Sequence, residues 1–206
     1  MPACRRLALE VEYERIRTVR AVRFRIPAAE YLGRTEDMRY YLGLGSNLGE
    51  PRANLADARR RLAANGIRVR KISSLYRTEP VGISGQPWYL NQTVQVEADL
   101  SPRRLLSLVK RLEAEMGRTP GARNAPRVID IDILLAGQAV VDTPALTVPH
   151  PRLAERNFEL VPLAEIAPRT IHPLLRKTIR TLLRASSDRS WVEKVPSRLK
   201  PRRPAS

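Results

Sequence analysis

Two acidic side chains lie two positions apart within the apolar stretch RVIDIDILL, residues 127–135. The residues around them are mostly β-branched or aliphatic, which is typical of a buried β-strand. Because side chains at i and i+2 of a strand project from the same face, we expect Asp130 and Asp132 on one side of a sheet and the neighbouring isoleucines on the other. The two carboxylates would be roughly 7 Å apart along the strand, given its rise per residue.

A divalent cation would relieve the repulsion between two such carboxylates. Mg²⁺ suits the pair, since it prefers oxygen ligands and completes its coordination with water and substrate phosphates. Two such ions about 4 Å apart can hold both the attacking and the leaving oxygen of a phosphoryl transfer. Asp-x-Asp is also common on ordinary exposed strand faces, so the pair alone leaves both a magnesium site and a plain polar surface open.

Cationic residues precede and follow the acidic pair. The upstream segment GRTPGARNAPR, residues 117–127, contains Arg118, Arg123 and Arg127, and its glycines and prolines predict a mobile loop. Guanidinium groups beside a carboxylate-bound metal are suited to polyphosphate. The downstream segment LTVPHPRLAERNF supplies more residues of this kind, together with an aromatic ring: Thr147, His150, Arg152, Arg156 and Phe158.

Strand and helix patterns alternate from Tyr40 onward. We expect strands at 40–45, 67–80, 89–100 and 128–137, the last returning through AVVDTPALTVP, and helices at 46–66 and 101–117. The first helix has an apolar stripe at helical spacing, made of Leu48, Leu55, Ala58 and Leu62. Ser101 can cap the second helix, with Pro102 in its first turn.

This order of elements predicts an α+β fold, a ferredoxin-like antiparallel sheet with helices packed on one face. Two C-terminal helices are expected, at 155–168 and 173–186. We therefore predict one domain at 40–184, preceded by an extension of unknown role at 1–39 that includes the possible strand TVRAVRFRI. Residues 185–206 are predicted to be a flexible basic tail.

The composition of the chain limits the compartment and the class of protein to which it can belong. The chain has 206 residues and one cysteine, Cys4, so it has no internal disulfide and is expected in a reducing compartment. It lacks the apolar run of about 18 residues that a transmembrane helix needs, and charges interrupt its N-terminus where a signal peptide would be apolar. We predict a soluble cytoplasmic protein with no membrane partner.

The net charge of +16 raises an alternative, a small basic RNA-binding protein with a ferredoxin-like sheet. Most of the excess lies at the C-terminal end, where residues 169–206 hold 11 basic and 2 acidic residues. RNA-binding sheets display aromatic rings for stacking bases, whereas VIDIDIL shows acids in the comparable place. Nucleic acid is therefore not the expected partner.

Six segments in order, from about Tyr40 to Pro168, resemble the 6-hydroxymethyl-7,8-dihydropterin pyrophosphokinases of folate biosynthesis. They are LGLGSNLGEPRANL, SSLYRTEPVG, QPWYLNQTV, RLEAEMGR, RNAPRVIDIDILL and VPHPRLAERNF. The resemblance implies a ferredoxin-like enzyme that uses ATP and Mg²⁺. Such an enzyme moves the β,γ-diphosphate of ATP onto the hydroxymethyl group of the pterin, and AMP leaves.

The resemblance also implies roles for individual residues. Asp130 and Asp132 match the ligands of two Mg²⁺ ions, and Arg118 and Arg127 match two loop arginines that handle phosphates. The expected ATP contacts are Glu113, Arg127, Thr147, His150 and Arg156. The expected pterin pocket consists of Gly45, Asn47, Thr78, Val81, Tyr89, Asn91 and Phe158, with Tyr89 and Phe158 stacking on the pterin ring.

The loop before Arg127 departs from the family pattern. Some members have a tryptophan and a further arginine there, whereas this chain has Pro120 and Asn124 in the neighbourhood and is about one residue shorter. The resemblance leaves the contacts of this loop open. It implies ATP and the pterin as partners; we expect a monomer, and docking to a neighbouring enzyme of the pathway stays open.

Overall fold

The computed structural model describes residues 38–80, 85–118 and 125–196. The predicted N-terminal strand, Val81, Arg123 and the end of the basic tail lie outside these residues. The helices and the 3₁₀ turn are α2 Pro51–Ala64, α3 Pro102–Glu115, η1 Leu153–Glu155, α4 Asn157–Ile166 and α5 Ile179–Ala185. The strands are β1 Met38–Ser46, β2 Arg68–Ile72, β3 Tyr76–Thr78, β4 Tyr89–Ala98, β5 Asp130–Ala136, β6 Val141–Thr143, β7 Leu146–Val148 and β8 Val192–Lys194.

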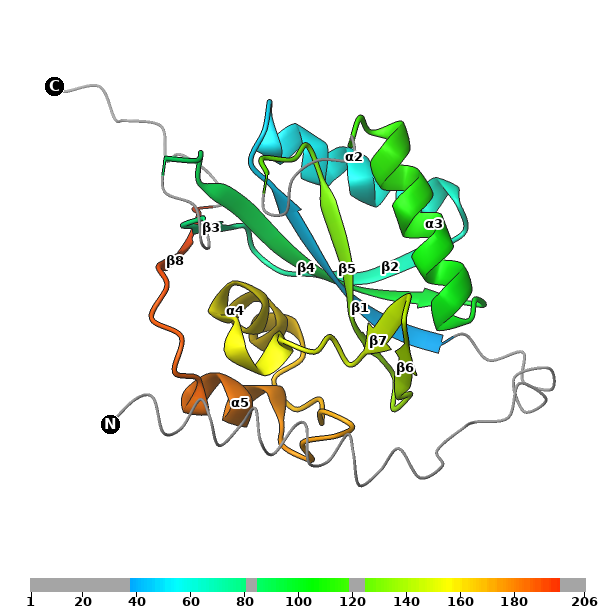
Figure 1. Ribbon diagram of the computed structural model, residues 1–206, viewed down its shortest axis with the longest axis vertical. Helices are drawn as coiled ribbons and strands as arrows, with labels where there is room; N and C mark the ends of the chain where they lie inside the picture. The colour runs from blue at the N-terminus through cyan, green and yellow to red at the C-terminus, as the bar shows by residue number, and fades with distance from the viewer. Residues whose placement is uncertain (1–37, 81–84, 119–124, 197–206) are drawn as a thin grey trace, which may run out of the picture.

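Six strands form one antiparallel sheet, and five of them follow the order β5-β1-β4-β3-β8. The sixth, β2, pairs with the same edge of β4 as β3 does, but with the C-terminal half of that strand. The first strand along the chain thus lies between the last and the third strands of the β-α-β-β-α-β unit. This is the ferredoxin-like arrangement, and it confirms the predicted fold class (Figure 1).

Each face of the sheet is covered by different helices (Figure 1). Alternate residues of β1 separate the two sides: Tyr40, Leu42 and Leu44 belong to the core formed with α2 and α3, and Tyr41 belongs to the core formed with α4 and α5. The two C-terminal helices therefore pack on the face that the β-α-β-β-α-β unit leaves open. They cover part of that face, and the rest is available for a site.

The helix signals in the sequence correspond to observed ends. Ser101 caps α3 by accepting a hydrogen bond from the Arg104 backbone N–H, with Pro102 in the first turn, as predicted. Leu55, Ala58 and Leu62 are the buried stripe of α2, and the chain leaves that helix through Gly66, whose φ of +79° favours glycine. Leu48 does not belong to the stripe, because it precedes α2 and is 46% exposed.

Several elements differ from the expected ranges. The single strand expected at 67–80 is two strands, β2 and β3, separated at residues 73–75. The return after β5 is a separate hairpin, β6–β7, whose two strands form a small sheet of their own. The last expected helix, 173–186, is helical only from Ile179 because the preceding residues form a turn closed by an Ile171–Thr178 bridge.

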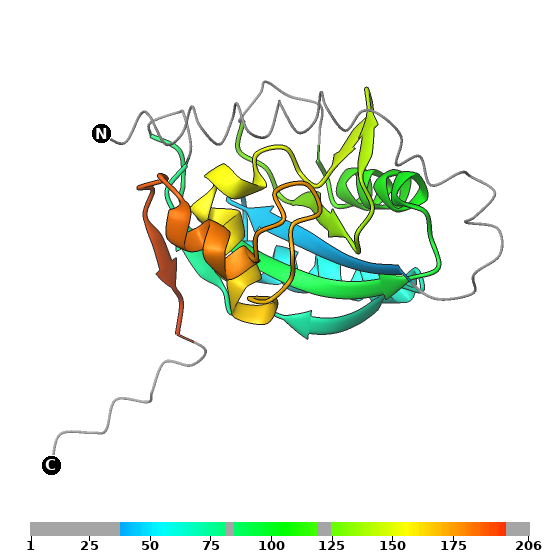
Figure 2. The same ribbon diagram turned by 90° about the horizontal axis from the view of Figure 1, so that it is seen from below.

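The stretch predicted to be a flexible tail from residue 185 contributes a strand to the sheet. β8 pairs with β3 and forms the edge of the sheet farthest from β5. Figure 2 draws this strand in orange-red, near the C-terminal end of the chain. Trp191 precedes it and donates its backbone N–H to Glu79 Oε1 at 2.8 Å. None of the helices in the described ranges is both long and apolar enough to cross a membrane.

Candidate active site

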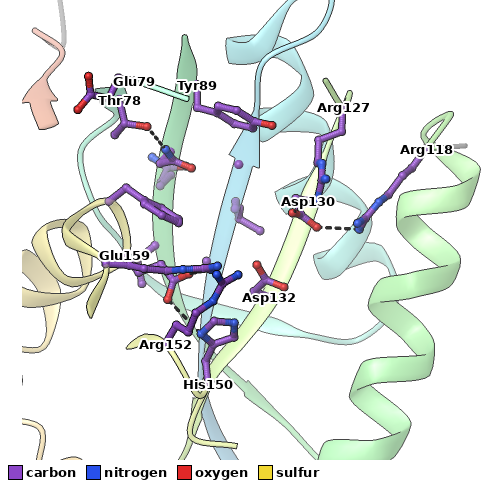
Figure 3. A pocket seen from close by; sticks show the side chains of 18 of the residues that line it. Thr78, Glu79, Tyr89, Arg118, Arg127, Asp130, Asp132, His150, Arg152 and Glu159 are labelled. Atoms are coloured by element: carbon purple, nitrogen blue, oxygen red, sulfur yellow. Dashed lines mark hydrogen bonds and ion pairs between the residues drawn. The ribbon is translucent and has the colours of Figure 1, made fainter. Parts of the chain in front are cut away.

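A cavity of about 680 Å³ lies on the sheet face opposite α2 and α3. Asp130 and Asp132 project into it from β5, whereas Ile131 and Ile133 pack in the core with α2 and α3 (Figure 3). The alternation predicted from the sequence is therefore observed. The strand has one apolar face for the core and one acidic face for the cavity.

Glycines of β1 form the floor between the two walls of the cavity. Gly45 pairs with Asp130 on one side and with Asn91 of β4 on the other, and Gly43 pairs with Asp132 and with Thr93. Because these positions have no side chains, the space above β1 stays open between the acidic strand and β4. Asp130 and Asn91 are two strands apart, roughly 10 Å by the spacing of strands in a sheet.

Two arginines hold Asp130. Arg127 Nη1 lies 2.6 Å from Oδ2 of the carboxylate, and Arg118 Nη1 lies 2.7 Å from Oδ1. Arg118 Nη1 also lies 2.5 Å from Oε2 of Glu113, a side chain that is 2% exposed. The predicted phosphate-handling arginines are thus beside the predicted metal ligand, where they neutralise one of the two aspartates.

Asp132 has a different electrostatic environment. Burial, together with the negative charges of Asp130 and Glu159, raises the pKa of this carboxyl from 3.8 to about 7. A carboxyl that is hard to ionise beside another carboxylate is a site where a divalent cation would be stabilising. The donor set, oxygen atoms of two aspartates next to open space for phosphates, fits Mg²⁺.

His150 and Glu159 of α4 form the opposite wall of this end of the cavity (Figure 3). Arg156 also lines the cavity and pairs with Glu159. Glu159 is 4% exposed; its Oε1 accepts a hydrogen bond from Arg156 Nη1 at 2.8 Å, and its Oε2 lies 3.4 Å from His150 Nδ1. Burial lowers the pKa of His150, so its imidazole is mainly neutral at pH 7. The wall thus presents a guanidinium and a neutral imidazole towards the aspartates.

The other end of the cavity is lined by Tyr89, Asn91, Thr78 and Phe158. Asn91 is 7% exposed and donates from Nδ2 to Thr78 Oγ1 at 2.7 Å, which fixes the orientation of its amide. The Arg156 guanidinium lies 5.3 Å from the centroid of the Phe158 ring. Two aromatic rings and an oriented amide at one place suit a flat heteroaromatic ligand with a polar edge.

Three of the predicted site residues in the described ranges do not line the cavity. Glu113 accepts the Ile131 backbone N–H at 2.6 Å and pairs with Lys110 and Arg118, so it joins α3 to β5 and positions Arg118. Asn47 accepts the Arg127 backbone N–H at 2.8 Å and donates to the Pro87 carbonyl at 3.2 Å. Thr147 lies in the β6–β7 hairpin, with Oγ1 3.4 Å from Asp142 Oδ1.

The sequence from residue 41 to residue 168 matches the family described as 7,8-dihydro-6-hydroxymethylpterin-pyrophosphokinase, HPPK. The chain belongs to the HPPK family. This confirms the resemblance that the six sequence segments predict. The RNA-binding alternative has no support from this match, and the open face of the sheet carries the two aspartates.

Curated relatives include HPPK enzymes of single-domain length and longer proteins. The chain is 46% identical over 158 residues to 2-amino-4-hydroxy-6-hydroxymethyldihydropteridine pyrophosphokinase of Methylorubrum extorquens, covering 76% of this chain and 98% of the relative. It is 44% identical over 127 residues to the Bacillus subtilis protein of the same name, covering 61% and 76%. The folate synthesis bifunctional protein of Pisum sativum is 41% identical over 132 residues, which cover 64% of this chain and 26% of that protein.

Solved structures support the fold. The Plasmodium falciparum HPPK-DHPS structure with pteroate superimposes with a TM-score of 0.60 at 17% identity, covering 72% of this chain and 42% of that one. At that identity the likeness concerns the fold of the HPPK domain alone.

The HPPK cavity also contains Arg152, one of the cations noted downstream of the acidic pair, and residues that the sequence did not indicate: Glu79, Gln86, Gln92, Thr93, Lys110 and Glu159. Lys110 could have been found, because it lies one helical turn before Glu113 on the same side of α3. Glu159 gave no such signal, since a glutamate near the start of a helix is common on exposed surfaces. Only the packing of α4 against the sheet brings it beside Asp132.

Proposed function

We propose that this HPPK-family chain transfers the β,γ-diphosphate of ATP to the hydroxymethyl group of 6-hydroxymethyl-7,8-dihydropterin, giving AMP and the pterin diphosphate used in folate biosynthesis. The observation that carries the proposal is the row Asn91, Gly45 and Asp130 across three neighbouring strands. A flat ring bound in the proposed ring slot (Thr78, Tyr89, Asn91 and Phe158) would lie roughly 10 Å from the acidic centre at Asp130, by strand spacing. A hydroxymethyl substituent on a ring held at Asn91 would extend over Gly45 towards that centre.

Asp130 and Asp132 would hold two Mg²⁺ ions, and this number belongs to the proposal. When bound, the ions would supply positive charge beside the phosphates, which lowers the energy of the charge that develops during transfer. Asp130 would exchange its contacts with Arg118 and Arg127 for the metal. The two guanidinium groups would then be free to bind phosphate oxygens, which they can do with two parallel hydrogen bonds.

The reaction itself is an in-line displacement. The pterin hydroxyl oxygen forms a bond to the β-phosphorus, the bond from that phosphorus to the oxygen shared with the α-phosphate breaks, and AMP leaves with that oxygen. The hydroxyl proton passes to water. The protein acts mainly by positioning both substrates and by surrounding the phosphates with cations, namely Arg118, Arg127, Lys110, Arg152 and Arg156 around the cavity.

Pterin binding would use the ring slot. Tyr89 and Phe158 would stack on the faces of the ring. Asn91, oriented by Thr78, would pair with the amide and amino edge, since an asparagine side chain offers a donor and an acceptor together. His150 and Arg156 would contact the nucleotide phosphates from the opposite wall. Glu113 and Asn47 would act indirectly, by holding Arg118 and Arg127.

The product nucleotide tests the proposal. The protein is incubated with ATP, Mg²⁺ and 6-hydroxymethyl-7,8-dihydropterin, and AMP and ADP are separated and quantified. Diphosphate transfer gives AMP in equal amount to the pterin consumed, whereas ADP would indicate an ordinary kinase and overturn the proposal. Omitting Mg²⁺ from the same mixture tests the metal requirement. Action as a cytoplasmic monomer, and docking to another enzyme of the pathway, stay predictions.

A further inference from the structure

We propose that Asp132, His150 and Glu159 form a binding site for a transition-metal dication, of the Zn²⁺, Co²⁺ or Mn²⁺ class, that is distinct from the magnesium site proposed at Asp130 and Asp132. One ligand atom from each of the three residues lies within 4.8 Å of the other two. The residues come from three separate elements, β5, the segment after β7, and α4. They face one another across the cavity (Figure 3).

Two buried atoms of this cluster lack a hydrogen-bond partner among the described residues. These are Oε2 of Glu159 and Nδ1 of His150, which lie 3.4 Å apart without the geometry of a hydrogen bond. Leaving buried polar atoms unsatisfied is costly. A cation between them would satisfy both at once, and the Glu159 side chain, 4% exposed, is aimed at that point.

The distances also suit a metal. Four ligands bound tetrahedrally at about 2.0–2.1 Å are separated from one another by about 3.3 Å. The Glu159–His150 pair is already near this separation, at 3.4 Å, and an Asp132 carboxylate oxygen lies within 4.8 Å of both ligand atoms. Arg156 binds Oε1 of Glu159 at 2.8 Å and so fixes the carboxylate while leaving Oε2 available.

The ligand chemistry selects the class of metal. One imidazole nitrogen with two carboxylates is a mixed nitrogen and oxygen set, which favours Zn²⁺ and its first-row neighbours, whereas Mg²⁺ prefers oxygen alone. Such an ion would hold Asp132 and His150, two groups that the proposed function assigns to Mg²⁺ and to ATP. Inhibition by Zn²⁺ would follow from this, and that consequence alone rests on the proposed function.

Metal binding can be measured without either substrate. Metal-free protein is titrated with Co²⁺, followed by the visible absorption of the bound ion, and Zn²⁺ is then added to displace it. We expect one Co²⁺ per chain, retained in excess Mg²⁺. Glu159→Gln keeps an acceptor for Arg156 but removes the ligand charge, and should raise the Kd for Co²⁺ at least about tenfold, as loss of metal-site groups commonly does. His150→Ala should do the same.

Asp130→Asn is the matched control, because it removes the same charge from the same cavity without removing a ligand of the triad. It should change the Kd by less than about fivefold, because Arg118 and Arg127 already neutralise the Asp130 carboxylate. Thermal unfolding of each variant verifies that it is folded. The inference is overturned if wild-type protein binds no Co²⁺, if neither Glu159→Gln nor His150→Ala weakens binding, or if Asp130→Asn weakens it as much as they do. None of these results bears on whether the chain forms AMP from ATP, because the titration contains neither substrate.

Discussion

Arg127 Nη1 lies 2.6 Å from Oδ2 of Asp130, so the predicted metal ligand and the predicted phosphate-binding arginine are paired with each other. The side chains are 20% and 22% exposed, which makes this a partly buried ion pair. Breaking such a pair without replacement would be costly. In the proposed reaction Mg²⁺ replaces Arg127 as the partner of Asp130, and the phosphates replace Asp130 as the partner of Arg127. Substrate binding and the release of Arg127 are therefore coupled.

The first prediction follows from this exchange. Arg127→Ala should lower kcat for AMP formation by about 100- to 1000-fold, the usual cost of removing one group that stabilises transition-state charge. Pterin affinity, measured by titration of the protein with the pterin, should change much less, because Arg127 binds Asp130 of β5, which is two strands away from Asn91 in the ring slot. Arg127→Lys should be intermediate, since it keeps the charge but not the planar fork. Equal losses in kcat and in pterin affinity would place Arg127 elsewhere.

The second prediction concerns the aspartates. Asp130→Ala and Asp132→Ala should each reduce AMP formation by at least about a thousandfold, because each removes several kcal/mol of metal-dependent stabilisation. The measurement is the initial rate at saturating ATP and Mg²⁺, with circular dichroism to verify the fold. Near-normal turnover in either variant would reject the metal role.

The stability of the Asp132→Asn variant tests separately whether the negative charge of Asp132 destabilises the folded chain. The carboxyl has a pKa of about 7 in the folded chain and 3.8 as its ordinary value, so the folded state binds the proton more tightly and loses stability as pH rises between these values. The uncharged amide lacks this penalty. Substrate-free Asp132→Asn should therefore be more stable than wild type at pH 8, on the order of 1–2 kcal/mol, and the difference should vanish near pH 4. Lower stability of the variant at pH 8 would contradict this account.

The sequence predicted what depends on local pattern. Alternation along a strand was enough to place Asp130 and Asp132 on one face and Ile131 and Ile133 on the other, and both are observed. The cap at Ser101 and the order of the elements were equally local, and the order determines the ferredoxin-like topology.

What the sequence left open depends on register and packing. Nothing in the spacing of Gly45 and Asn91 shows that they pair across β1 and β4. The position of Glu159 follows from how α4 packs on the sheet, and that packing also brings its carboxylate within 3.4 Å of His150. Family position alone assigned Glu113 to ATP, whereas in the fold it is buried behind Arg118.

The third prediction tests the glycine floor. A Cβ at Gly45 would lie 2.8 Å from Oδ1 of Asn91, closer than such contacts allow, so Gly45→Ala must displace the Asn91 amide. Pterin affinity should fall at least about tenfold, since a buried amide edge would lose its hydrogen bonds, while ATP binding changes little. Gly43→Ala is the matched control, because its Cβ would contact the Leu134 side chain at an ordinary 3.4 Å. Equal pterin affinity of the two variants would exclude Asn91 from the pterin site.

The fourth prediction concerns the C-terminal strand. Glu165 of α4 accepts hydrogen bonds from Ser74, Tyr76 and Lys194, and so joins β2–β3 and β8 to the helix. Burial alone would raise the pKa of Glu165, but these hydrogen bonds lower it from an ordinary 4.5 to about 2. Its stabilisation is therefore complete above about pH 4.5 and is lost as pH falls towards 2.

Glu165→Gln should therefore lower the free energy of unfolding at pH 7 by on the order of 1–2 kcal/mol, because the group is partly exposed and several charged hydrogen bonds weaken together. Urea unfolding at a series of pH values measures this difference, which should shrink as pH falls below 4.5. Glu193→Gln, at an exposed position of β8, is the control and should have little effect at any pH. A loss of stability that is the same at pH 7 and at low pH would mean that the packing of the side chain, and not its charge, holds β8 in place.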